Sequence, residues 1–390
     1  MANSFKEILI RGVEEVIVRE HLEAALKSGK KLRVKLGVDP TSPNIHIGRA
    51  GALWKLRDFQ DLGHTVVFIV GDFTGLIGDT SDKESERPMM TEAQVKQNIK
   101  TYFKQAAKII DPKKSEMHYN STWLKKLGFL EIGKMANAFG LHEFEARENI
   151  SRRMKAGKRV SVRELLYPIM QGYDSVAVKA DVEIGGTDQK FNLLAGRVIQ
   201  PLYGQPPQDI LTRTLLEGTD GRKMSSSWGN VINITDEPND MFGKIMSIPD
   251  SLIEKYFVLA TRLPATEIHE IITSRSNPRD QKFMLAREIT TLYYGKKEAE
   301  KAAKEFKNVF SNKETPRDMP VIKLSGKLIE LMELLIKASV TSKSEARRLI
   351  EQGAVEIDQK KKTDPKEMVN LRKSFVLKIG KTKFYRVIAK

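Results

Sequence analysis

The sequence predicts an α/β fold built on a doubly wound parallel sheet, and three features near the N-terminus support it. Arg33 to Asp39 (RVKLGVD) and His64 to Phe73 (HTVVFIVGDF) are apolar runs typical of buried strands. Between them, His46 to Leu62 has apolar residues at helical spacing, and Gly63 marks its end. A strand, a helix and a second strand in this order form a right-handed parallel unit, the opening of a Rossmann-like sheet.

The rest of the chain predicts further elements of this fold, followed by a helical region and a separate C-terminal domain. Residues from about 91 to 183 are mostly helical in pattern, which predicts an insertion between the two halves of the sheet. Strands are expected at Asp181 to Gly185 and near Asp209 to Thr212, and a helical region from about Glu237 to Phe310. Ser311 to Pro320, polar and containing proline, is typical of a linker. The expected parts are a Rossmann-like domain over 1–220, a polar loop and helical domain over 221–310, the linker over 311–320 and a small α+β domain over 321–390.

Composition narrows the classes of protein. At 390 residues, the chain is long enough for two or three domains with their own cores. It has no cysteine, which excludes disulfides, thiolate metal sites and cysteine nucleophiles. Residues 1–30 mix acidic with apolar residues, unlike a secretory or transit peptide, and they predict an amphipathic helix. No apolar run approaches the roughly 20 residues that cross a bilayer, so we expect a soluble, cytoplasmic protein that does not enter a membrane.

The charge of the chain indicates a polyanionic partner. The formal net charge is +16, and about +9 of it falls in residues 321–390, where about 17 Lys/Arg stand against about 8 Asp/Glu. Such an excess most often means nucleic acid, with solubility alone as the alternative. The strand-like runs FVLKIG and FYRVIA fit a folded basic module better than a basic tail. We therefore expect RNA binding at the C-terminal end.

A first motif lies at the turn from the first strand to the first helix. The loop Gly37 to Arg49, GVDPTSPNIHIGR, is stiffened by two prolines and leads into the helix. Helix N-termini attract phosphate, His46 can donate to a phosphoryl oxygen, and Gly48 lets an adenine ring come close to the backbone. The loop has neither the P-loop lysine nor a GxGxxG pattern, which argues against ordinary kinases and dehydrogenases. Taken alone, a histidine near a helix start is more often structural.

A second motif, Asp220 to Ser227 (DGRKMSSS), begins about 175 residues after His46. Lysine and hydroxyl groups in a polar loop of this kind can close over phosphates, and the alternative is a surface loop with a helix N-cap. Together, the HIGR and KMSSS loops resemble the paired signature of class I aminoacyl-tRNA synthetases, in which two loops clamp ATP from opposite halves of one fold. Their order and separation both fit this family.

A third motif indicates the amino acid. Tyr167, Gln171 and Asp174 in YPIMQGYD fall at i, i+4 and i+7, so one helix face presents a phenol, an amide and a carboxylate to one ligand. The alternative is a partly polar helix face. With GGTDQ, Gly185 to Gln189, the motif resembles the substrate pocket of tyrosyl-tRNA synthetases. Asp174 can accept a hydrogen bond from a phenolic hydroxyl, which phenylalanine lacks.

The resemblance to the tyrosyl-tRNA synthetase family covers the whole chain and implies a two-step reaction. Tyrosine and ATP would form tyrosyl-adenylate and pyrophosphate, and tyrosine would then pass to the 3′ end of tRNA(Tyr). Catalysis would rest on positioning and on stabilising phosphoryl charge, without a nucleophilic side chain. Mg²⁺ would arrive with ATP and need no dedicated protein site. The family also implies a homodimer whose interface lies near Trp123 to His142.

The resemblance assigns roles to single residues. Around the amino acid it places groups that hold the ammonium, the carboxyl region and the phenol: Asp79, Asn120, Tyr167, Gln171, Asp174 and Gln189. Around ATP it places groups for the adenine, the ribose and the phosphates: Gly37, Asp39, His46, Gly48, Gly186, Asp188, Leu215, Leu216, Lys223 and Ser226. The residues that it assigns to transition-state and pyrophosphate contacts are Thr41, His46, Lys83, Arg87 and Lys223.

The basic C-terminal module carries SKSEARRLIEQGAVEI, Ser342 to Ile357. This motif resembles the RNA-binding domain named after ribosomal small-subunit protein four. In these synthetases that domain contacts the variable arm and the anticodon region of the tRNA, mostly through phosphates and shape. Lys343, Arg347 and Arg348, at the start of the expected helix, are the candidate RNA contacts.

Three positions depart from the family pattern. Arg49 stands where the first signature usually ends in histidine, and Ser226 stands where the second loop usually has another lysine. Lys35 occupies the position at which many bacterial relatives place a tyrosine at the substrate hydroxyl. The last difference leaves Asp174 as the main group that recognises that hydroxyl, and it indicates the second of the two bacterial subtypes.

Two other interpretations stay open from the sequence alone. One is a catalytically silent paralogue that keeps the fold and binds RNA, which the departures at Lys35, Arg49 and Ser226 motivate. The other is tryptophanyl-tRNA synthetase, which shares the catalytic fold but normally lacks the C-terminal RNA module. Asp174 and Gln171 favour a phenol over an indole.

Overall fold

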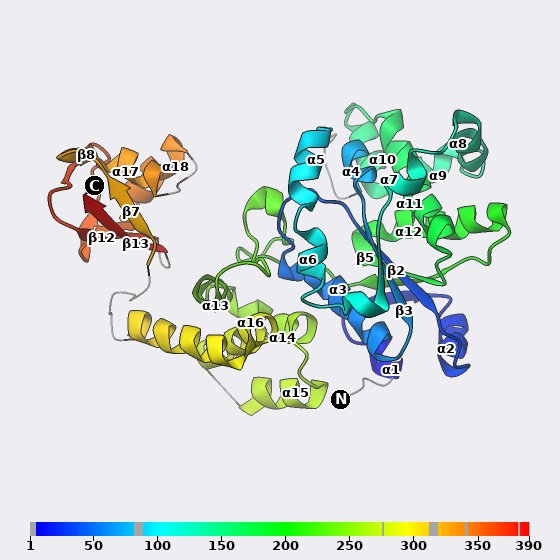
Figure 1. The fold of residues 1–390 in the computed structure, drawn as a ribbon, viewed down its shortest axis with the longest axis horizontal. Helices are drawn as coiled ribbons and strands as arrows, with labels where there is room; N and C mark the ends of the chain where they lie inside the picture. Colours follow the sequence, from blue (N-terminus) through cyan, green and yellow to red (C-terminus); the bar gives the residue numbers. More distant parts are fainter. Residues whose placement is uncertain are drawn as a thin grey trace. The chain divides into compact units, whose positions relative to one another are not determined.

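The computed structural model describes residues 5–81, 89–274, 277–311, 319–338, 340, 342–380 and 383–389 (Figure 1). The chain forms two compact units. The first consists of Met1–Asp236 and Ile248–Leu285, and the second of Glu237–Ser247 and Ala286–Lys390. The domain boundaries predicted near residues 220, 310 and 320 stay predictions, because most of the linker lies outside the described residues.

The first unit is built on a six-stranded sheet. Its strands are β1 Val13–Ile17, β2 Arg33–Val38, β3 Thr65–Val70, β4 Ser115–Tyr119, β5 Val182–Gly186 and β6 Asp209–Arg213. They lie in the order β1-β6-β5-β2-β3-β4, and all neighbours are parallel except β1, which is antiparallel to β6 at one edge. The interior strand β3, between β2 and β4, is almost entirely buried, as its apolar run TVVFIV predicts. The expected doubly wound α/β fold is confirmed.

The first crossover helix, α3, spans Ile47–Asp61 and agrees with the prediction. Leu53, Leu56 and Phe59 recur at helical spacing and are buried, because this face packs against the sheet. Gly63 follows the helix with a φ of 90°, a left-handed conformation that favours glycine. The helix therefore begins at the HIGR loop and returns the chain to β3.

Two strands differ from the sequence-based expectation. The prediction of a helix over residues 1–30 was wrong in part. The segment contains the short helix α1 (Phe5–Ile8) and helix α2 (Arg19–Lys27), but strand β1 lies between them. The mostly helical insertion likewise contains β4, which extends the sheet beside β3. Both strands lie at the edges of the sheet, where tertiary backbone hydrogen bonds override a weak local pattern.

Helices surround the sheet of the first unit (Figure 1). The long helix α11 (Val162–Val178) carries the YPIMQGYD motif and packs against α12 (Lys190–Ile199), which follows the GGTDQ segment. The other helices of this unit are α4 Thr74–Ile77, α5 Glu92–Ile99, α6 Tyr102–Ala106, α7 Ser121–Leu124, α8 Phe129–Ala136, α9 Leu141–Glu145, α10 Glu148–Lys155, α14 Ile253–Ala260 and α15 Ala265–Ser274.

The second unit contains helices and a small α+β fold. Its helical part holds α13 (Pro238–Met246) and most of α16 (Pro278–Ser311), which is interrupted at Gly295. The strands after the linker are β7 Val321–Leu324, β8 Leu328–Glu330, β9 Val355–Ile357, β10 Lys360–Lys362, β11 Met368–Asn370, β12 Phe375–Ile379 and β13 Lys383–Ala389. They form a five-stranded and a two-stranded sheet, which enclose an apolar core with α17 (Leu331–Lys337) and α18 (Lys343–Glu351).

Candidate active site

A cavity of about 240 Å³ opens at the carboxyl ends of β2, β5 and β6, where ligands bind in doubly wound sheets. Its lining includes every predicted tyrosine, ATP and transition-state residue that the structure describes: Gly37, Asp39, Thr41, His46, Gly48, Asp79, Asn120, Tyr167, Gln171, Asp174, Gly186, Asp188, Gln189, Leu215, Leu216, Lys223 and Ser226. Lys83 and Arg87 lie outside the described residues. The fold thus gathers segments far apart in sequence at one site.

His46 is the N-cap of α3, and its protonation state follows from its contacts. The backbone N–H of Arg49 donates to its Nδ1 at 3.3 Å, so in the neutral ring the proton sits on Nε2. Burial, reinforced by the positive charges of Arg49 and Lys223, lowers the pKa of His46 to about 3. His46 is therefore a neutral hydrogen-bond donor at physiological pH.

The KMSSS loop contacts the opposite wall of the cavity. Nζ of Lys223 lies 2.7 Å from Oδ2 of Asp188, and the Ser226 hydroxyl donates to Oγ of Ser42 in the HIGR loop at 3.1 Å. The two signature loops are thus in direct contact. Gly186 is required here, because a Cβ would lie 2.4 Å from Oδ1 of Asp188.

Helix α11 presents Tyr167 toward the end of β2. The Tyr167 hydroxyl donates to Oδ2 of Asp39 at 2.9 Å, and the Thr74 hydroxyl donates to Oδ1 at 2.7 Å. Burial raises the pKa of Asp39 to about 6 and that of Tyr167 well above 10. Tyr167 therefore keeps its proton and fixes the carboxylate of Asp39.

Asp174, two turns further along α11 than Tyr167, is 3% exposed and accepts two hydrogen bonds. Nε1 of Trp123 donates to Oδ1 at 2.7 Å, and Nδ2 of Asn120 donates to Oδ2 at 3.2 Å. Burial raises the pKa of Asp174 to about 7, and the nearby charge of Lys35 opposes this shift. The contact of Trp123 with Asp174 was not predicted from the sequence, because this side chain reaches Asp174 only when β4 and α7 are in place.

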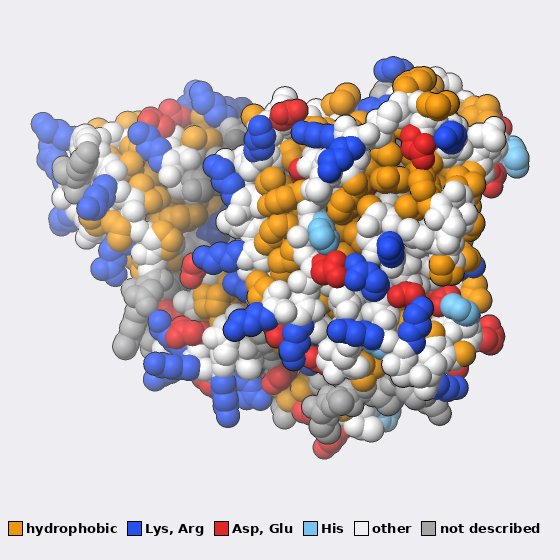
Figure 2. Space-filling view, turned by 45° about the vertical axis from the view of Figure 1, so that its right-hand side comes forward, with side chains coloured by type: hydrophobic (Ala, Val, Ile, Leu, Met, Phe, Trp, Pro, Cys, Tyr) orange, Lys and Arg blue, Asp and Glu red, His pale blue; other side chains and the backbone are white. Residues whose placement is uncertain are grey.

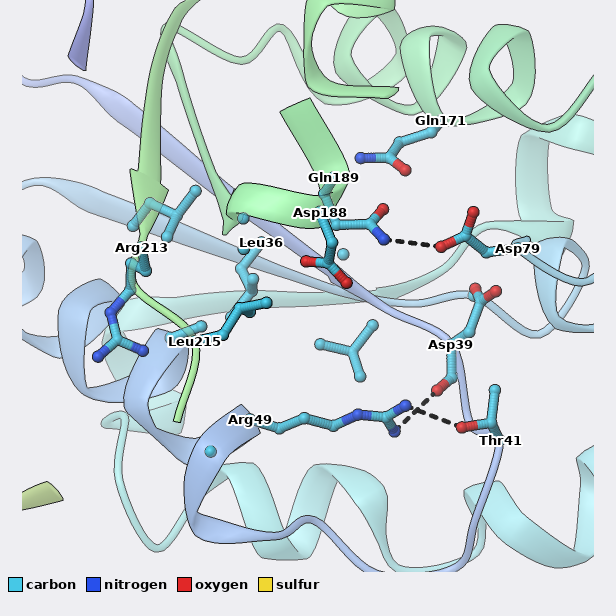
Figure 3. Close-up of a pocket in the computed structure, with 18 of the residues that line it drawn as sticks. Leu36, Asp39, Thr41, Arg49, Asp79, Gln171, Asp188, Gln189, Arg213 and Leu215 are labelled. Carbon is cyan, nitrogen blue, oxygen red and sulfur yellow. Dashed lines mark hydrogen bonds between the residues drawn. The ribbon is translucent and has the colours of Figure 1, made fainter. Parts of the chain in front are cut away.

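A second acidic group faces the start of α12 (Figure 3). Nε2 of Gln189 donates to Oδ2 of Asp79 at 2.7 Å, and the hydroxyl of Ser81 donates to Oδ1 at 2.6 Å. The amide of Gln189 and the carboxylate of Asp79 thereby lie together at the cavity.

Comparison with known proteins identifies the family. Residues 27–311 match the family described as tRNA synthetases class I (W and Y), and residues 312–387 match the tyrosine–tRNA ligase SYY-like C-terminal domain. The chain is 47% identical to a tyrosine–tRNA ligase of Thermotoga maritima over 98% of its length and 96% of the relative's. This chain belongs to the tyrosine–tRNA ligase family.

Other similarities agree with this family. A tyrosine–tRNA ligase of Dehalococcoides mccartyi is 48% identical over 99% of both chains. The fold also resembles a C-terminally truncated mitochondrial tyrosyl-tRNA synthetase of Aspergillus nidulans, with a TM-score of 0.67 and 23% identity over 79% of this chain and 94% of that one. The predicted tyrosyl-tRNA synthetase family is confirmed, and its members share the Rossmann-like core seen here.

Two arginines that line the cavity were not among the predicted site residues of this tyrosine–tRNA ligase family member. The guanidinium of Arg49 donates to Oγ1 of Thr41 at 2.8 Å and to the carbonyl oxygen of Asp39 at 3.3 Å (Figure 3). Arg213 packs on Gly51, where a Cβ would lie 2.4 Å from its Nη1. Together with Lys223, these two arginines place three cationic side chains at the cavity, which suits a polyphosphate ligand.

The described residues offer neither a metal-binding cluster nor a membrane-spanning helix. They contain no group of three or more His, Cys, Asp or Glu side chains that could hold a metal ion. None of the helices within the same residues combines the length and the apolar character needed to cross a bilayer.

Proposed function

We propose that this chain activates L-tyrosine with ATP and transfers it to the 3′ end of tRNA(Tyr). The observation that carries this proposal is the cavity in which the Asp174 carboxylate, His46 at a helix start and Lys223 of the KMSSS loop meet. Full-length similarity to tyrosine–tRNA ligases supports the same activity.

The tyrosine phenol is recognised by Asp174. Its carboxylate receives two protein donors and has lone pairs left for a third. Phenylalanine has no hydroxyl to donate, so it would leave this buried carboxylate without that hydrogen bond. The acceptors for the ammonium are Gln171, Tyr167 and Asp79, and the amide of Gln189 serves the carboxyl region of the substrate.

ATP lies between the two signature loops. Gly48 and the side chains of Leu215 and Leu216 contact the adenine, and Asp188 accepts from the ribose hydroxyls. Thr41, His46 and Lys223 stabilise charge on the phosphates, with Lys83 and Arg87 as further pyrophosphate contacts. Mg²⁺ enters as part of the ATP complex.

In the first step, a carboxylate oxygen of tyrosine attacks the α-phosphorus. The bond from that phosphorus to the bridging oxygen breaks, and the electron pair leaves with pyrophosphate. In the second step, a hydroxyl of the terminal ribose of the tRNA attacks the carbonyl carbon, and AMP leaves. Both steps depend on positioning and charge stabilisation, without a covalent enzyme intermediate.

The second unit supplies the tRNA contact. Lys343, Arg347 and Arg348 are exposed on α18, and Lys343 and Arg347 lie one turn apart on the same side of the helix. This cluster suits phosphates of an RNA backbone.

We also propose that the chain forms a homodimer and acts in the cytoplasm. Within the segment expected at the interface, Phe129 and Leu130 of α8 and Leu141 of α9 are 91%, 75% and 62% exposed. Figure 2 shows hydrophobic side chains gathered on the side of the first unit that carries these helices in Figure 1. Sedimentation should show a dimer that Phe129→Glu dissociates and Leu328→Glu, in the second unit, does not. A monomeric wild type contradicts the dimer.

The activity is tested by ATP–pyrophosphate exchange with single amino acids. We expect exchange with tyrosine and not with phenylalanine or tryptophan. Exchange that depends on tryptophan overturns the proposal and favours a tryptophanyl-tRNA synthetase. The absence of exchange with every amino acid also overturns it and favours the catalytically silent paralogue. Deletion of 321–390 should spare this exchange and abolish charging of tRNA(Tyr), and intact charging would contradict the tRNA contact.

A further inference from the structure

A buried charge pair lies behind the cavity. Lys35 on β2 and Glu183 on β5 are direct partners in the parallel register, and Nζ of Lys35 lies 2.8 Å from Oε1 of Glu183. Their side chains are 0% and 1% exposed, and neither residue lines the cavity. Because desolvation offsets most of the attraction in such a pair, stability alone is a weak reason for its presence.

The ammonium of Lys35 has no hydrogen left for a ligand. Its three donors match three acceptors: Oε1 of Glu183, the carbonyl oxygen of Gln171 at 2.9 Å and the hydroxyl oxygen of Ser175 at 2.8 Å. Lys35 therefore does not replace the tyrosine that many bacterial relatives place at the substrate hydroxyl. It acts through the residues that it holds.

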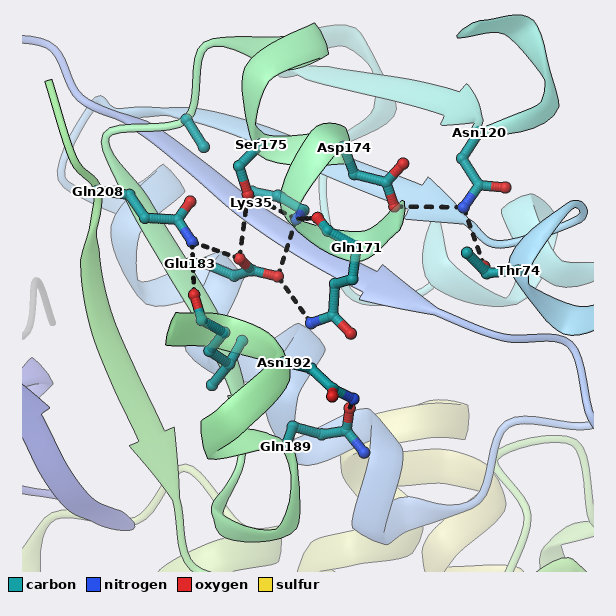
Figure 4. A network of polar contacts seen from close by, with 12 residues as sticks. Lys35, Thr74, Asn120, Gln171, Asp174, Ser175, Glu183, Gln189, Asn192 and Gln208 are labelled. Carbon is teal, nitrogen blue, oxygen red and sulfur yellow. Dashed lines mark hydrogen bonds and ion pairs between the residues drawn. The ribbon is translucent and has the colours of Figure 1, made fainter. Parts of the chain in front are cut away.

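Glu183 holds the side-chain amide of Gln171 in one orientation (Figure 4). Nε2 of Gln171 donates to Oε1 of Glu183 at 3.0 Å. The other carboxylate oxygen accepts from the hydroxyl of Ser175 at 3.1 Å and from Nε2 of Gln208. A carboxylate can only accept hydrogen bonds. If the side-chain amide of Gln171 were flipped, its oxygen would face an oxygen of Glu183, and the two would repel each other. The Oε1 of Gln171 is thus the atom left for the cavity, which Gln171 lines.

We propose that Lys35 and Glu183 are positioning residues for the amino group of tyrosine. Glu183 fixes the side chain of Gln171 with its Oε1 toward the cavity, where that oxygen accepts from the substrate ammonium, and Lys35 pairs with Glu183 and holds its carboxylate in place. This inference rests on the proposed role of Gln171 in tyrosine binding.

The test compares two ligands that differ at the amino group. Equilibrium dialysis measures the affinity of the wild type and of Glu183→Gln for tyrosine and for 3-(4-hydroxyphenyl)propionate, which lacks the ammonium. The amide of the variant can donate as well as accept, so Gln171 is free to turn. We expect the preference for tyrosine to fall about tenfold to a hundredfold, with little change for the propionate. Asp58→Asn is the matched control, because Asp58 is a buried, ion-paired carboxylate remote from the cavity lining.

Each outcome decides the inference. A fall in the preference at unchanged propionate affinity supports it. An unchanged preference overturns it, whether both ligands bind normally or both bind equally less well, because a merely structural role moves the two together. If Glu183→Gln does not fold, Lys35→Met/Glu183→Gln, which removes both charges, is measured instead. A wild type that binds neither ligand and shows no tyrosine-dependent exchange contradicts the proposed function, which is a different result.

Discussion

Nε1 of Trp123 donates a 2.7 Å hydrogen bond to Oδ1 of Asp174, so an indole from the insertion supports the carboxylate on α11. Asp174 is buried, and its pKa is raised to about 7. A donor that favours the charged form lowers this pKa, and burial raises it. With Asp174 in its proposed role, the affinity for a phenol near neutral pH depends on Trp123, a side chain that the predicted pocket does not include.

Trp123→Phe should weaken tyrosine binding in a pH-dependent way. Loss of the donor raises the pKa of Asp174 further, so the carboxyl is protonated at pH 7 and ionised again near pH 8.5. We expect the dissociation constant for tyrosine to rise several-fold at pH 7 and to recover in part at the higher pH. Trp54→Phe is the control, since Trp54 stacks with Arg262 outside the cavity. A loss of equal size at both pH values would mean that Trp123 only packs.

Asp174→Asn should weaken tyrosine binding and make the stability of the fold less sensitive to pH. The folded state raises the pKa of Asp174 from 3.8 to about 7, so this carboxyl lowers the free energy of unfolding as pH rises between these values. We expect the stability of the variant relative to the wild type to rise by roughly 1–3 kcal/mol between pH 4 and pH 8. Urea unfolding across this range measures it. Asp280→Asn, at an exposed position, should show no such trend, and a pH-independent difference would argue against the raised pKa.

The parts of the site that sequence could predict depend on local spacing. The HIGR loop, the KMSSS loop and the i, i+4, i+7 face of α11 each place their side chains through one turn or one helix. The contact of Trp123 with Asp174 could not be predicted, because strand β4, which precedes Trp123, lies in a segment whose pattern is mostly helical. An edge strand of five residues carries little periodic signal of its own.

The sequence contains an indication of the Lys35–Glu183 pair, but it can be interpreted only with the register of β2 and β5. Lys35 and Glu183 are charged residues within VKLGV and VEIGG, whose other residues are apolar or glycine. Two buried strands with opposite charges are candidates to be neighbours. The strand order β5-β2 then places the two directly opposite each other. The residue pattern alone does not give the strand order. The sequence therefore indicated that Lys35 departs from the family pattern, but not that it pairs with Glu183.

His46 should act as a neutral donor throughout the working pH range. Its pKa is lowered to about 3, so the ionisation of His46 should cause no break in the pH profile of adenylate formation between about pH 5 and pH 9. His46→Ala should lower kcat about 100-fold to 1,000-fold, as loss of one transition-state donor does. His46→Asn should retain more activity, because its amide can both cap α3 and donate. Equal losses in the two variants, in pre-steady-state measurements of adenylate, would contradict the donor role.

Arg49→Ala should weaken the use of ATP more than the use of tyrosine. The guanidinium holds Thr41 and the backbone of Asp39 at the part of the cavity that we propose for the phosphates, and its charge adds to that of Lys223. We expect the KM for ATP in pyrophosphate exchange to rise about tenfold, with a smaller change in the KM for tyrosine. Arg57→Ala, on the same helix and paired with Asp61, is the control. A larger effect on tyrosine would place Arg49 at the amino acid.

Replacement of Lys343, Arg347 and Arg348 by alanine should impair charging through tRNA affinity alone. All three side chains are exposed on α18, where loss of phosphate contacts weakens binding and lowers its salt dependence by about one unit of slope per contact. We expect the KM for tRNA(Tyr) to rise about tenfold or more, with tyrosine-dependent pyrophosphate exchange unchanged. The matched control replaces Lys297, Lys301 and Lys304, three exposed lysines of α16, so that both variants lose the same net charge. If both variants lose tRNA affinity equally, the general positive charge of the chain, and not α18, attracts the RNA.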